Sequence, residues 1–375
     1  MKVLHQALSV GLGLTLAIGL AACGGGKNQT KTSDKAPSTS PASASASATP
    51  SESNKASEKK DAATKPTFEP ATVRVAYMPN IGSAGSIFTA IEKGYFKEVG
   101  LTVETKEFQG GPAEIAALSS GNIDIAQIGH GAHALCIEGQ AVIFQNDQTN
   151  SLADEVVGNR SKGVQKPEDL KGKKIAVASG TSSEIILHQV LAKAGLSLSD
   201  VEIVEMTNEG MTTAMLGGSI DACAAWSPNT VTLKNGLKDN YVCLGGNADF
   251  ADKATFPGSF ITTNQFAKEH KDLLVRFAAA INKAHEDRSN DTEAVARLLS
   301  AKVDVPEDVM LGSVGEGDWK TITQIAGDTD KLKKVYETQQ QVFIDAQRIK
   351  EKVPVEKYVL FDIMAEAFKL YQTVY

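Results

Sequence analysis

The chain contains 375 residues, of which 42% are apolar and 22% are charged. This composition supports one large or two medium folded domains, and it excludes a coiled coil and a chain that is disordered throughout. The formal net charge of −7 disfavours a basic nucleic-acid-binding protein, and four cysteines are too few for a disulfide-stabilised scaffold.

The N-terminal segment has the three-part layout of a secretory signal peptide. Lys2 supplies a positive start, Ala7–Leu20 is mainly apolar, and Leu20-Ala21-Ala22-Cys23 ends the segment with small residues and a thiol. A transmembrane helix is the alternative, but the apolar stretch is shorter than the roughly 20 residues that a bilayer requires. We therefore predict a signal peptide over residues 1–22. Its ending resembles the bacterial lipoprotein signal, which implies lipidation of Cys23 and a membrane anchor.

The next segment is dominated by Ser, Ala, Thr, Lys and Pro, and large apolar side chains are almost absent from it before Phe68. Such a segment cannot bury enough surface to offset the entropy that it would lose on ordering. Residues 23–70 are therefore predicted to be the lipidated cysteine and a disordered linker to a folded body.

The three remaining cysteines point to neither a disulfide framework nor a metal site. Cys136, Cys223 and Cys243 are odd in number and are flanked by apolar residues, so we predict buried free thiols. No Cys or His spacing matches a zinc site. We expect no metal and no cofactor.

The folded body begins with an alternation of strands and helices. Three predicted strands enclose two predicted helices: strands Val73–Tyr77, Leu101–Phe108 and Ile123–Ile128, and helices Ala84–Lys93 and Ala113–Ser119. Gly94 suits the end of the first helix, and Pro112 suits the first turn of the second. This order is typical of a parallel α/β sheet.

The same order recurs further along the chain. The recurring elements are strands Lys174–Ala178, Val201–Met206 and Ile220–Ala225, and helices Glu184–Ala194 and Met211–Leu216. Residues 117–124 (ALSSGNID) align with residues 214–221 (AMLGGSID), so both units share a helix, a turn with glycine and an Ile-Asp pair before a strand. This internal repeat predicts two similar α/β lobes.

The C-terminal region is predicted to be helical. Apolar residues recur at three- and four-residue spacing in Ala294–Leu299, Asp330–Glu351 and Val359–Tyr371. These helices would cover one lobe or bridge both. We predict that residues 71–160 and 257–375 form lobe 1 and that residues 161–256 form lobe 2.

Five stretches of the body share their pattern with one known family: Ala90–Leu101, Ser119–Asp124, Lys166–Val177, Ile220–Pro228 and Val305–Val309. With them, residues 71–375 resemble the substrate-binding proteins of ABC importers, in the branch that binds taurine, aliphatic sulfonates and nitrate and also holds thiamine-precursor binders. The resemblance implies a two-lobed periplasmic-binding-protein-like α/β fold, in which each lobe is a mainly parallel sheet flanked by helices, with a helical C-terminal region.

The ligand of an open parallel sheet binds beyond the carboxyl ends of the strands. The turns at these ends precede helices, whose first N–H groups favour an anion, and their glycines let a backbone approach the ligand. Trp226 and Phe260 are expected to stack on the ligand, and Glu184 either complements a helix dipole or pairs with an ammonium group. The predicted ligand-binding residues are Asn80, Gly82, Ser83, Gly110, Gly111, Gly129, His130, Thr181, Ser182, Ser183, Glu184, Trp226, Asn229 and Phe260.

The resemblance implies a solute-binding protein on the outer face of the cytoplasmic membrane. It would capture a small sulfonate such as taurine and deliver it to ABC permease and ATPase subunits. Nitrate, a thiamine-precursor pyrimidine and an aromatic carboxylate remain open as alternatives. An enzyme is disfavoured, because the chain has no Gly-x-Ser-x-Gly elbow, no His-Glu-x-x-His motif and no glycine-rich nucleotide fingerprint after a strand. No nucleic-acid partner is expected.

Overall fold

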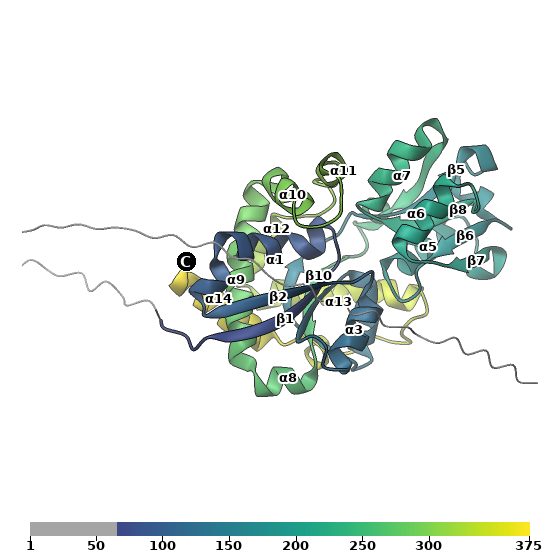
Figure 1. The fold of residues 1–375 in the computed structure, drawn as a ribbon. Coiled ribbons are helices and arrows are strands. Elements are labelled where there is room, and N and C mark those ends of the chain that lie inside the picture. Colours follow the sequence, from purple (N-terminus) through teal and green to yellow (C-terminus); the bar gives the residue numbers. More distant parts are fainter. Residues whose placement is uncertain (1–65) are drawn as a thin grey trace, which may run out of the picture. The chain divides into compact units, whose positions relative to one another are not determined.

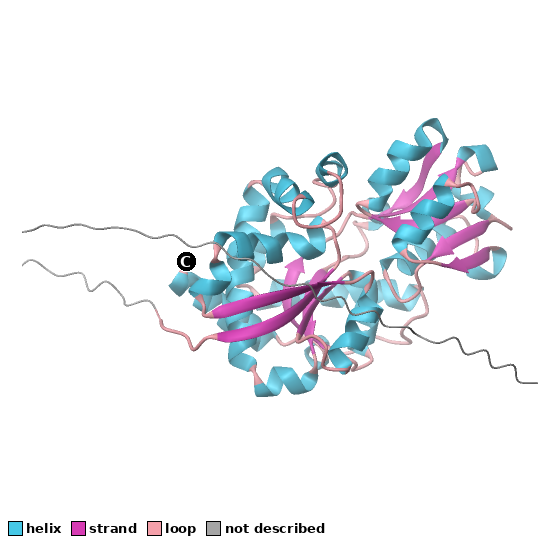
Figure 2. Ribbon diagram, viewed as in Figure 1, coloured by secondary structure: helices cyan, strands magenta, loops and turns pink. Residues whose placement is uncertain are grey.

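The computed structural model describes residues 66–375, which hold two five-stranded sheets flanked by helices (Figures 1 and 2). These residues all belong to one compact unit. The predicted signal peptide, Cys23 and the predicted linker as far as residue 65 lie outside the described residues. Within residues 66–375, no helix has the length and apolar character needed to cross a bilayer.

The first sheet has the strand order β2-β1-β3-β10-β4. Its strands are β1 (Ala71–Tyr77), β2 (Leu101–Glu107), β3 (Ile125–Ile128), β4 (Val142–Gln148) and β10 (Gly258–Thr262). β1 pairs in parallel with β2 and β3, whereas β10 is antiparallel to both β3 and β4. Helices α1 (Ile81–Lys93) and α3 (Gly111–Ser119) connect the parallel strands.

The second sheet repeats this plan in the order β7-β6-β8-β5-β9. Its strands are β5 (Asp154–Asn159), β6 (Lys174–Val177), β7 (Glu202–Glu205), β8 (Ala222–Trp226) and β9 (Tyr241–Gly246). β6 is parallel to β7 and β8, and β5 is antiparallel to β8 and β9. Helices α5 (Ser182–Lys193) and α6 (Asn208–Leu216) connect the parallel strands.

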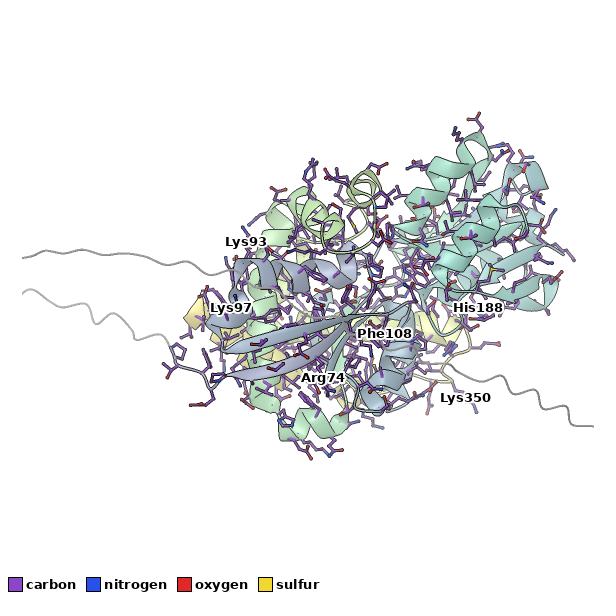
Figure 3. All side chains as sticks on the ribbon, in the orientation of Figure 1. Arg74, Lys93, Lys97, Phe108, His188 and Lys350 are labelled. Atoms are coloured by element: carbon purple, nitrogen blue, oxygen red, sulfur yellow. The ribbon has the colours of Figure 1, made fainter. Side chains whose placement is uncertain are left out.

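The predicted fold class is confirmed, and the repeated Ile-Asp pair has a structural role in both sheets. Asp124 accepts a hydrogen bond from the backbone N–H of Arg74 at 2.8 Å, and Asp221 accepts one from Lys174 at 2.9 Å. Arg74, labelled in Figure 3, also donates from its guanidinium to Asp124. Each aspartate therefore ties the start of one parallel strand to its neighbour. Each sheet is mixed, because one strand from outside the repeat, β10 or β5, runs antiparallel to both of its neighbours while the other four strands share one direction.

The remaining helices cover the sheets and form most of the C-terminal region. They are α2 (Tyr95–Glu98), α4 (His133–Ile137), α7 (Asn229–Leu237), α8 (Asn264–Glu269), α9 (Lys271–Asn290), α10 (Thr292–Ser300), α11 (Glu307–Gly312), α12 (Thr321–Ile325), α13 (Thr329–Asp345) and α14 (Phe361–Val374). α9 packs against α1 and α14.

Both faces of each sheet are covered by packed apolar side chains. Alternate side chains of a strand point to opposite faces, so each strand contributes to the core on both sides. In β1, Val73 and Val75 join the apolar core that includes α1 and α9, whereas Ala76 joins the core on the α3 side. In β6, Ile175 packs with α5 and Ala176 packs with α6. Since each sheet is covered on both faces, its strand ends are the places left for a binding site.

The chain passes between the sheets earlier than the sequence indicated. β5 lies in the second sheet, so the first crossing is at residues 149–153, and residues 154–160 do not belong with the first lobe. The prediction placed them there because β5 is an antiparallel strand outside the repeat. The second crossing lies between β9 and β10, at residues 247–257.

Two other predictions need correction. Cys243 is exposed, whereas Cys136 and Cys223 are buried as expected. Cys243 differs because β9 is an edge strand that pairs with β5 alone. Helix α13 ends at Asp345 rather than at Glu351, and the backbone turns at Gln347 with a φ of 56°.

Candidate functional site

A cavity of about 60 Å³ is lined by residues that follow the parallel strands of both sheets. Ten of the fourteen predicted ligand-binding residues line it: Asn80, Gly82, Ser83, Gly110, Gly111, Gly129, His130, Thr181, Ser182 and Trp226. Ser183, Glu184, Asn229 and Phe260 do not line it. The cavity therefore lies where parallel sheets place their ligands.

The first turns of α1 and α5 are built in the same way. Asn80 Oδ1 accepts from the N–H of Ser83 at 2.8 Å, and Ser83 Oγ accepts from the N–H of Met78 at 2.9 Å. In the second sheet, Thr181 Oγ1 accepts from the N–H of Ser183, whose Oγ accepts from the N–H of Ala178. These caps hold the strand-to-helix turns in shape and aim the first turns of both helices toward the cavity.

Two of the predicted ligand-binding residues, Thr181 and Ser183, use their hydroxyl groups within the protein. Ser183 Oγ donates to the carbonyl oxygen of Ala224 at 2.6 Å, and Ser183 is fully buried. Thr181 Oγ1 donates to the carbonyl oxygen of Ala178 at 2.7 Å. Ser183 therefore positions α5 against β8, and the hydroxyl hydrogen of Thr181, which lines the cavity, is already donated within the protein.

Glu184 has a partner within the chain. Its Oε2 accepts from the N–H of Gly180 at 2.7 Å and from the guanidinium of Arg348 at 2.6 Å. The carboxylate thus joins α5 to the segment after α13. The predicted pairing of Glu184 with a ligand ammonium group is not supported, because Arg348 supplies the positive charge.

Phe260 and Asn229 also lie away from the cavity. Phe260 is fully buried in the core, where its ring lies 5.2 Å from that of Phe277, because it points to the α9 side of β10. Asn229 donates to Thr212 Oγ1 at 3.0 Å and lines a separate outer pocket of about 260 Å³. Trp226 and Asn80 line both spaces, so the outer pocket borders the cavity.

The turn after β3 meets the turn before α5 at very close range. A Cβ atom on Gly131 would lie 2.1 Å from the carbonyl carbon of Thr181, so any larger residue would force the two backbones apart. Beside it, His130 Nε2 lies 2.9 Å from Asp154 Oδ2. Gln339 on α13 supports this turn by donating to the carbonyl oxygen of His130 at 2.9 Å.

Ten lining residues were not predicted from the sequence: Met78, Gln127, Ala132, Gln148, Ser151, Ala153, Asp154, Ser227, Glu316 and Trp319. Most come from the crossing at residues 149–153 or from segments outside the repeat. One signal was available for Glu316 and Trp319, since the segment Gly315-Glu316-Gly317-Asp318-Trp319 places acids and an indole in a glycine-rich turn between helices.

The loop that carries Glu316 contacts both the first crossing and β8. The carbonyl oxygen of Glu316 accepts from the N–H of Leu152 at 2.7 Å, and Ser313 Oγ lies 2.8 Å from Ser227 Oγ. Burial raises the pKa of the Glu316 carboxyl to about 8; the hydroxyls of Ser227 and Ser313 oppose this rise, and nearby carboxylates add to it. Glu316 is therefore mostly protonated at neutral pH.

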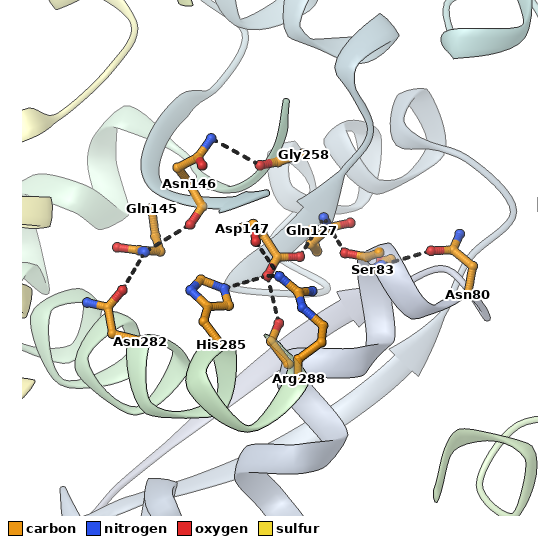
Figure 4. Close-up of polar contacts among 12 residues, drawn as sticks. Asn80, Ser83, Gln127, Gln145, Asn146, Asp147, Gly258, Asn282, His285 and Arg288 are labelled. Atoms are coloured by element: carbon orange, nitrogen blue, oxygen red, sulfur yellow. Dashed lines mark hydrogen bonds and ion pairs between the residues drawn. The ribbon is translucent and has the colours of Figure 1, made fainter. Parts of the chain in front are cut away.

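A buried ion cluster fixes the cavity wall on the first sheet (Figure 4). Asp147 accepts from Ser86 Oγ at 2.8 Å and from Gln127 Nε2 at 3.0 Å, and it lies 2.7 Å from His285 Nε2. Burial alone would raise the pKa of Asp147, but Arg288, His285 and Ser86 together hold it below its ordinary value. The Asp147 carboxylate is therefore charged at neutral pH.

Arg288 links this cluster to the glycine-rich loop. It is fully buried, lies 3.3 Å from Asp147 Oδ1, and holds its guanidinium carbon 4.7 Å from the ring centre of Trp319. The Trp319 indole N–H donates to the carbonyl oxygen of Val314 at 2.8 Å. Arg288 thus positions Trp319 at the cavity edge through a cation–π contact. Within residues 66–375, no group of three His, Cys, Asp or Glu side chains is arranged to hold a metal ion.

Comparison with known proteins shows the family to which the chain belongs. The family model described as NMT1/THI5 like matches residues 82–294, more than half of the chain. The chain belongs to the NMT1/THI5-like family. The matched region begins at the first turn of α1 and includes both α/β repeats except β1, and with them most of the cavity lining.

Three relatives have names that refer to binding. A binding protein of Brucella abortus (strain 2308) is 34% identical over 221 residues, 59% of this chain and 68% of that protein. A Bacillus subtilis (strain 168) protein named for binding aliphatic sulfonates is 32% identical over 238 residues, which cover 59% of this chain and 69% of that protein. The taurine-binding periplasmic protein of Escherichia coli (strain K12) is 26% identical over 224 residues, which cover 60% of this chain and 68% of that protein. None of these three is named an enzyme.

Solved structures share the fold at low sequence identity. The alkanesulfonate-binding protein SsuA of Xanthomonas axonopodis pv. citri, bound to MOPS, has a TM-score of 0.61 and 20% identity over 78% of this chain and 99% of its own. The nitrate-binding protein NrtA of Synechocystis PCC 6803 has a TM-score of 0.66 and 14% identity, and the match covers 80% of this chain and 89% of NrtA. The desulfurization enzyme DszB has a TM-score of 0.59 and 14% identity, and the match covers 80% of this chain and 99% of DszB. Because the fold also carries an enzyme, function must be argued from the site.

Proposed function

We propose that this protein is the extracytoplasmic solute-binding component of an ABC importer and that it captures a small sulfonate in the cavity. The observation that carries the proposal is the meeting of helix starts at one small cavity: Gly82 on α1, Gly111 on α3 and Ser182 on α5 all line it. The first N–H groups of these helices have no partner within the helix and favour a negatively charged group.

The cavity lining suits a sulfonate held without a cationic side chain. Asn80, the glycines and Ser182 are small or neutral, and neither Lys nor Arg lines the described cavity. The names of the Bacillus subtilis and Escherichia coli relatives support sulfonates as the class of solute.

The proposal includes delivery to a membrane permease with its ATPase, and a lipid anchor at Cys23. Both rest on the resemblance of the sequence to importer components and to lipoprotein signals, because Cys23 lies outside the described residues. In cells grown with a labelled fatty acid, we expect the cell-associated protein to carry the label. We expect the Cys23→Ser variant to lack it.

Calorimetric titration of the purified protein with taurine, propanesulfonate and nitrate tests the solute class. We expect saturable binding of at least one sulfonate with one site per chain, and weaker or absent binding of nitrate. Heat from nitrate alone, or from none of the three, would contradict the proposal.

A further inference from the structure

Asp154 presents an unused acceptor at the cavity. The residue is 2% exposed and lines the cavity, and its Oδ2 accepts from Asn247 Nδ2 at 2.6 Å and lies 2.9 Å from His130 Nε2. Its Oδ1 is buried and has no hydrogen-bond partner among the described residues. A buried carboxylate oxygen without a donor is costly, so its natural partner is an N–H or O–H group of the solute.

Two buried amide oxygens line the same cavity without partners. Gln127 is oriented by its neighbours, since Nε2 donates to the Asp147 carboxylate and to the carbonyl oxygen of Gly82. Because both of those atoms are acceptors, Gln127 Oε1 must point elsewhere, and it has no partner among the described residues. Gln148 Oε1 is also buried and unpartnered, and Gln148 is 6% exposed.

The charged lining of the cavity and its outer pocket has one sign. The cavity has the carboxylate of Asp154, together with Glu316, which is mostly protonated at neutral pH. The outer pocket, which shares Trp226 with the cavity, has Glu107, Glu209 and Asp304. No Lys or Arg side chain lines either described space. His130, 2.9 Å from Asp154 Oδ2, is the one lining side chain that can carry a positive charge, and a solute with only negative charge would add no further counter-charge to these carboxylates.

Two indoles accompany the carboxylates. Trp226 is the register partner of Asp154 in the β5–β8 pair, so the two residues are direct neighbours at the sheet end. Trp319 lines the cavity as well and is held in place by Arg288. Aromatic faces attract ammonium groups, which adds to the attraction of a carboxylate.

We propose that Asp154, with the amide oxygens of Gln127 and Gln148, forms a subsite for a primary ammonium group, so that the protein selects amino-sulfonates over sulfonates without an amine. An ammonium group has three N–H donors, and the subsite offers three buried acceptors that lack partners. The sulfonate end then takes the helix starts of α1, α3 and α5. This inference rests on the proposed capture of a sulfonate and assigns to Asp154 the role first considered for Glu184.

Two ligands of the same shape separate this inference from the proposed function. Taurine and propanesulfonate differ in that a methyl group replaces the ammonium group. Titration of the wild-type protein is expected to give an affinity for taurine about 10- to 100-fold higher, the range that one or two hydrogen bonds to a charged group supply. Equal affinities would overturn the ammonium subsite and leave sulfonate capture intact. Absence of binding by both would overturn sulfonate capture, and the subsite with it.

The variant Asp154→Asn tests which residue is responsible. It keeps the size of the side chain but removes its charge, so we expect taurine affinity to fall about 10- to 100-fold while propanesulfonate affinity is unchanged or higher. Glu155→Gln is the matched control, because it removes the same charge from the next residue of β5, which does not line the cavity. An equal loss for both ligands would contradict the inference, as would an equal effect of the two variants. The wild-type comparison of ligands decides the question even where Asp154→Asn does not fold.

Discussion

Glu316 is expected to make the stability of the unliganded protein fall as the pH rises. Burial raises the pKa of its carboxyl from 4.5 to about 8, so the folded state holds a proton that the unfolded state loses. The contribution of this group to stability is complete below about pH 4.5 and is lost as the pH rises through about 8. Glu316→Gln keeps the size of the side chain and removes its titration.

The magnitude follows from the two pKa values. Each unit of difference corresponds to about 1.4 kcal/mol, so the whole loss amounts to at most about 5 kcal/mol. Between about pH 5 and pH 8, the free energy of unfolding should fall by up to about 1.4 kcal/mol per pH unit, the slope of one proton. All other ionisable groups titrate in both the wild type and Glu316→Gln. The difference between their free energies of unfolding therefore isolates the contribution of Glu316.

Chemical denaturation at a series of pH values measures that difference. We expect Glu316→Gln to gain stability relative to the wild type as the pH rises, and the exposed Glu168→Gln to run parallel to the wild type. A difference between Glu316→Gln and wild type that stays constant from about pH 5 to pH 9 would refute the burial of an ionisable carboxyl at this place.

Two further variants test how the cavity is held. Gly131→Ala places a Cβ atom 2.1 Å from the backbone of Thr181, so solute affinity should fall by about tenfold or more in a titration, and an unchanged affinity would show that this approach is not needed. Arg288→Met removes the buried guanidinium from Asp147, which keeps only its contacts with Ser86, Gln127 and His285. Chemical denaturation should therefore show a loss of about 3–5 kcal/mol, against less than about 1 kcal/mol for the exposed Arg297→Met. Similar losses for the two arginine variants would contradict the role of the buried pair.

The repeated α/β units were predictable because their signals are local. Apolar strands, helices at regular spacing and a glycine turn before each Ile-Asp pair all lie within short stretches. Ten of the fourteen residues predicted at the strand ends line the cavity, and they make up half of its lining. The antiparallel strands were not predictable in this way. β5 pairs with β8, and β10 pairs with β3, and both pairings join residues that are far apart in the sequence.

The residues that were misplaced or missed depend on the same long-range contacts. Glu184 has a suitable position for a ligand contact, but Arg348, 164 residues further along the chain, occupies its carboxylate. Phe260 lies on β10, which begins beside the lining residue Gln148, yet its side chain points to the α9 side. Glu316 and Trp319 reach the cavity from a loop between helices, and no periodic pattern indicates where such a loop will lie.

A crystal structure of the protein with taurine would test the central claim most directly. The account predicts the sulfonate oxygens within hydrogen-bond distance of the N–H groups of Gly82, Gly111 or Ser182, and the taurine nitrogen next to Asp154 Oδ1. A sulfonate that lies against Asp154, or taurine that lies outside this cavity, would contradict the account.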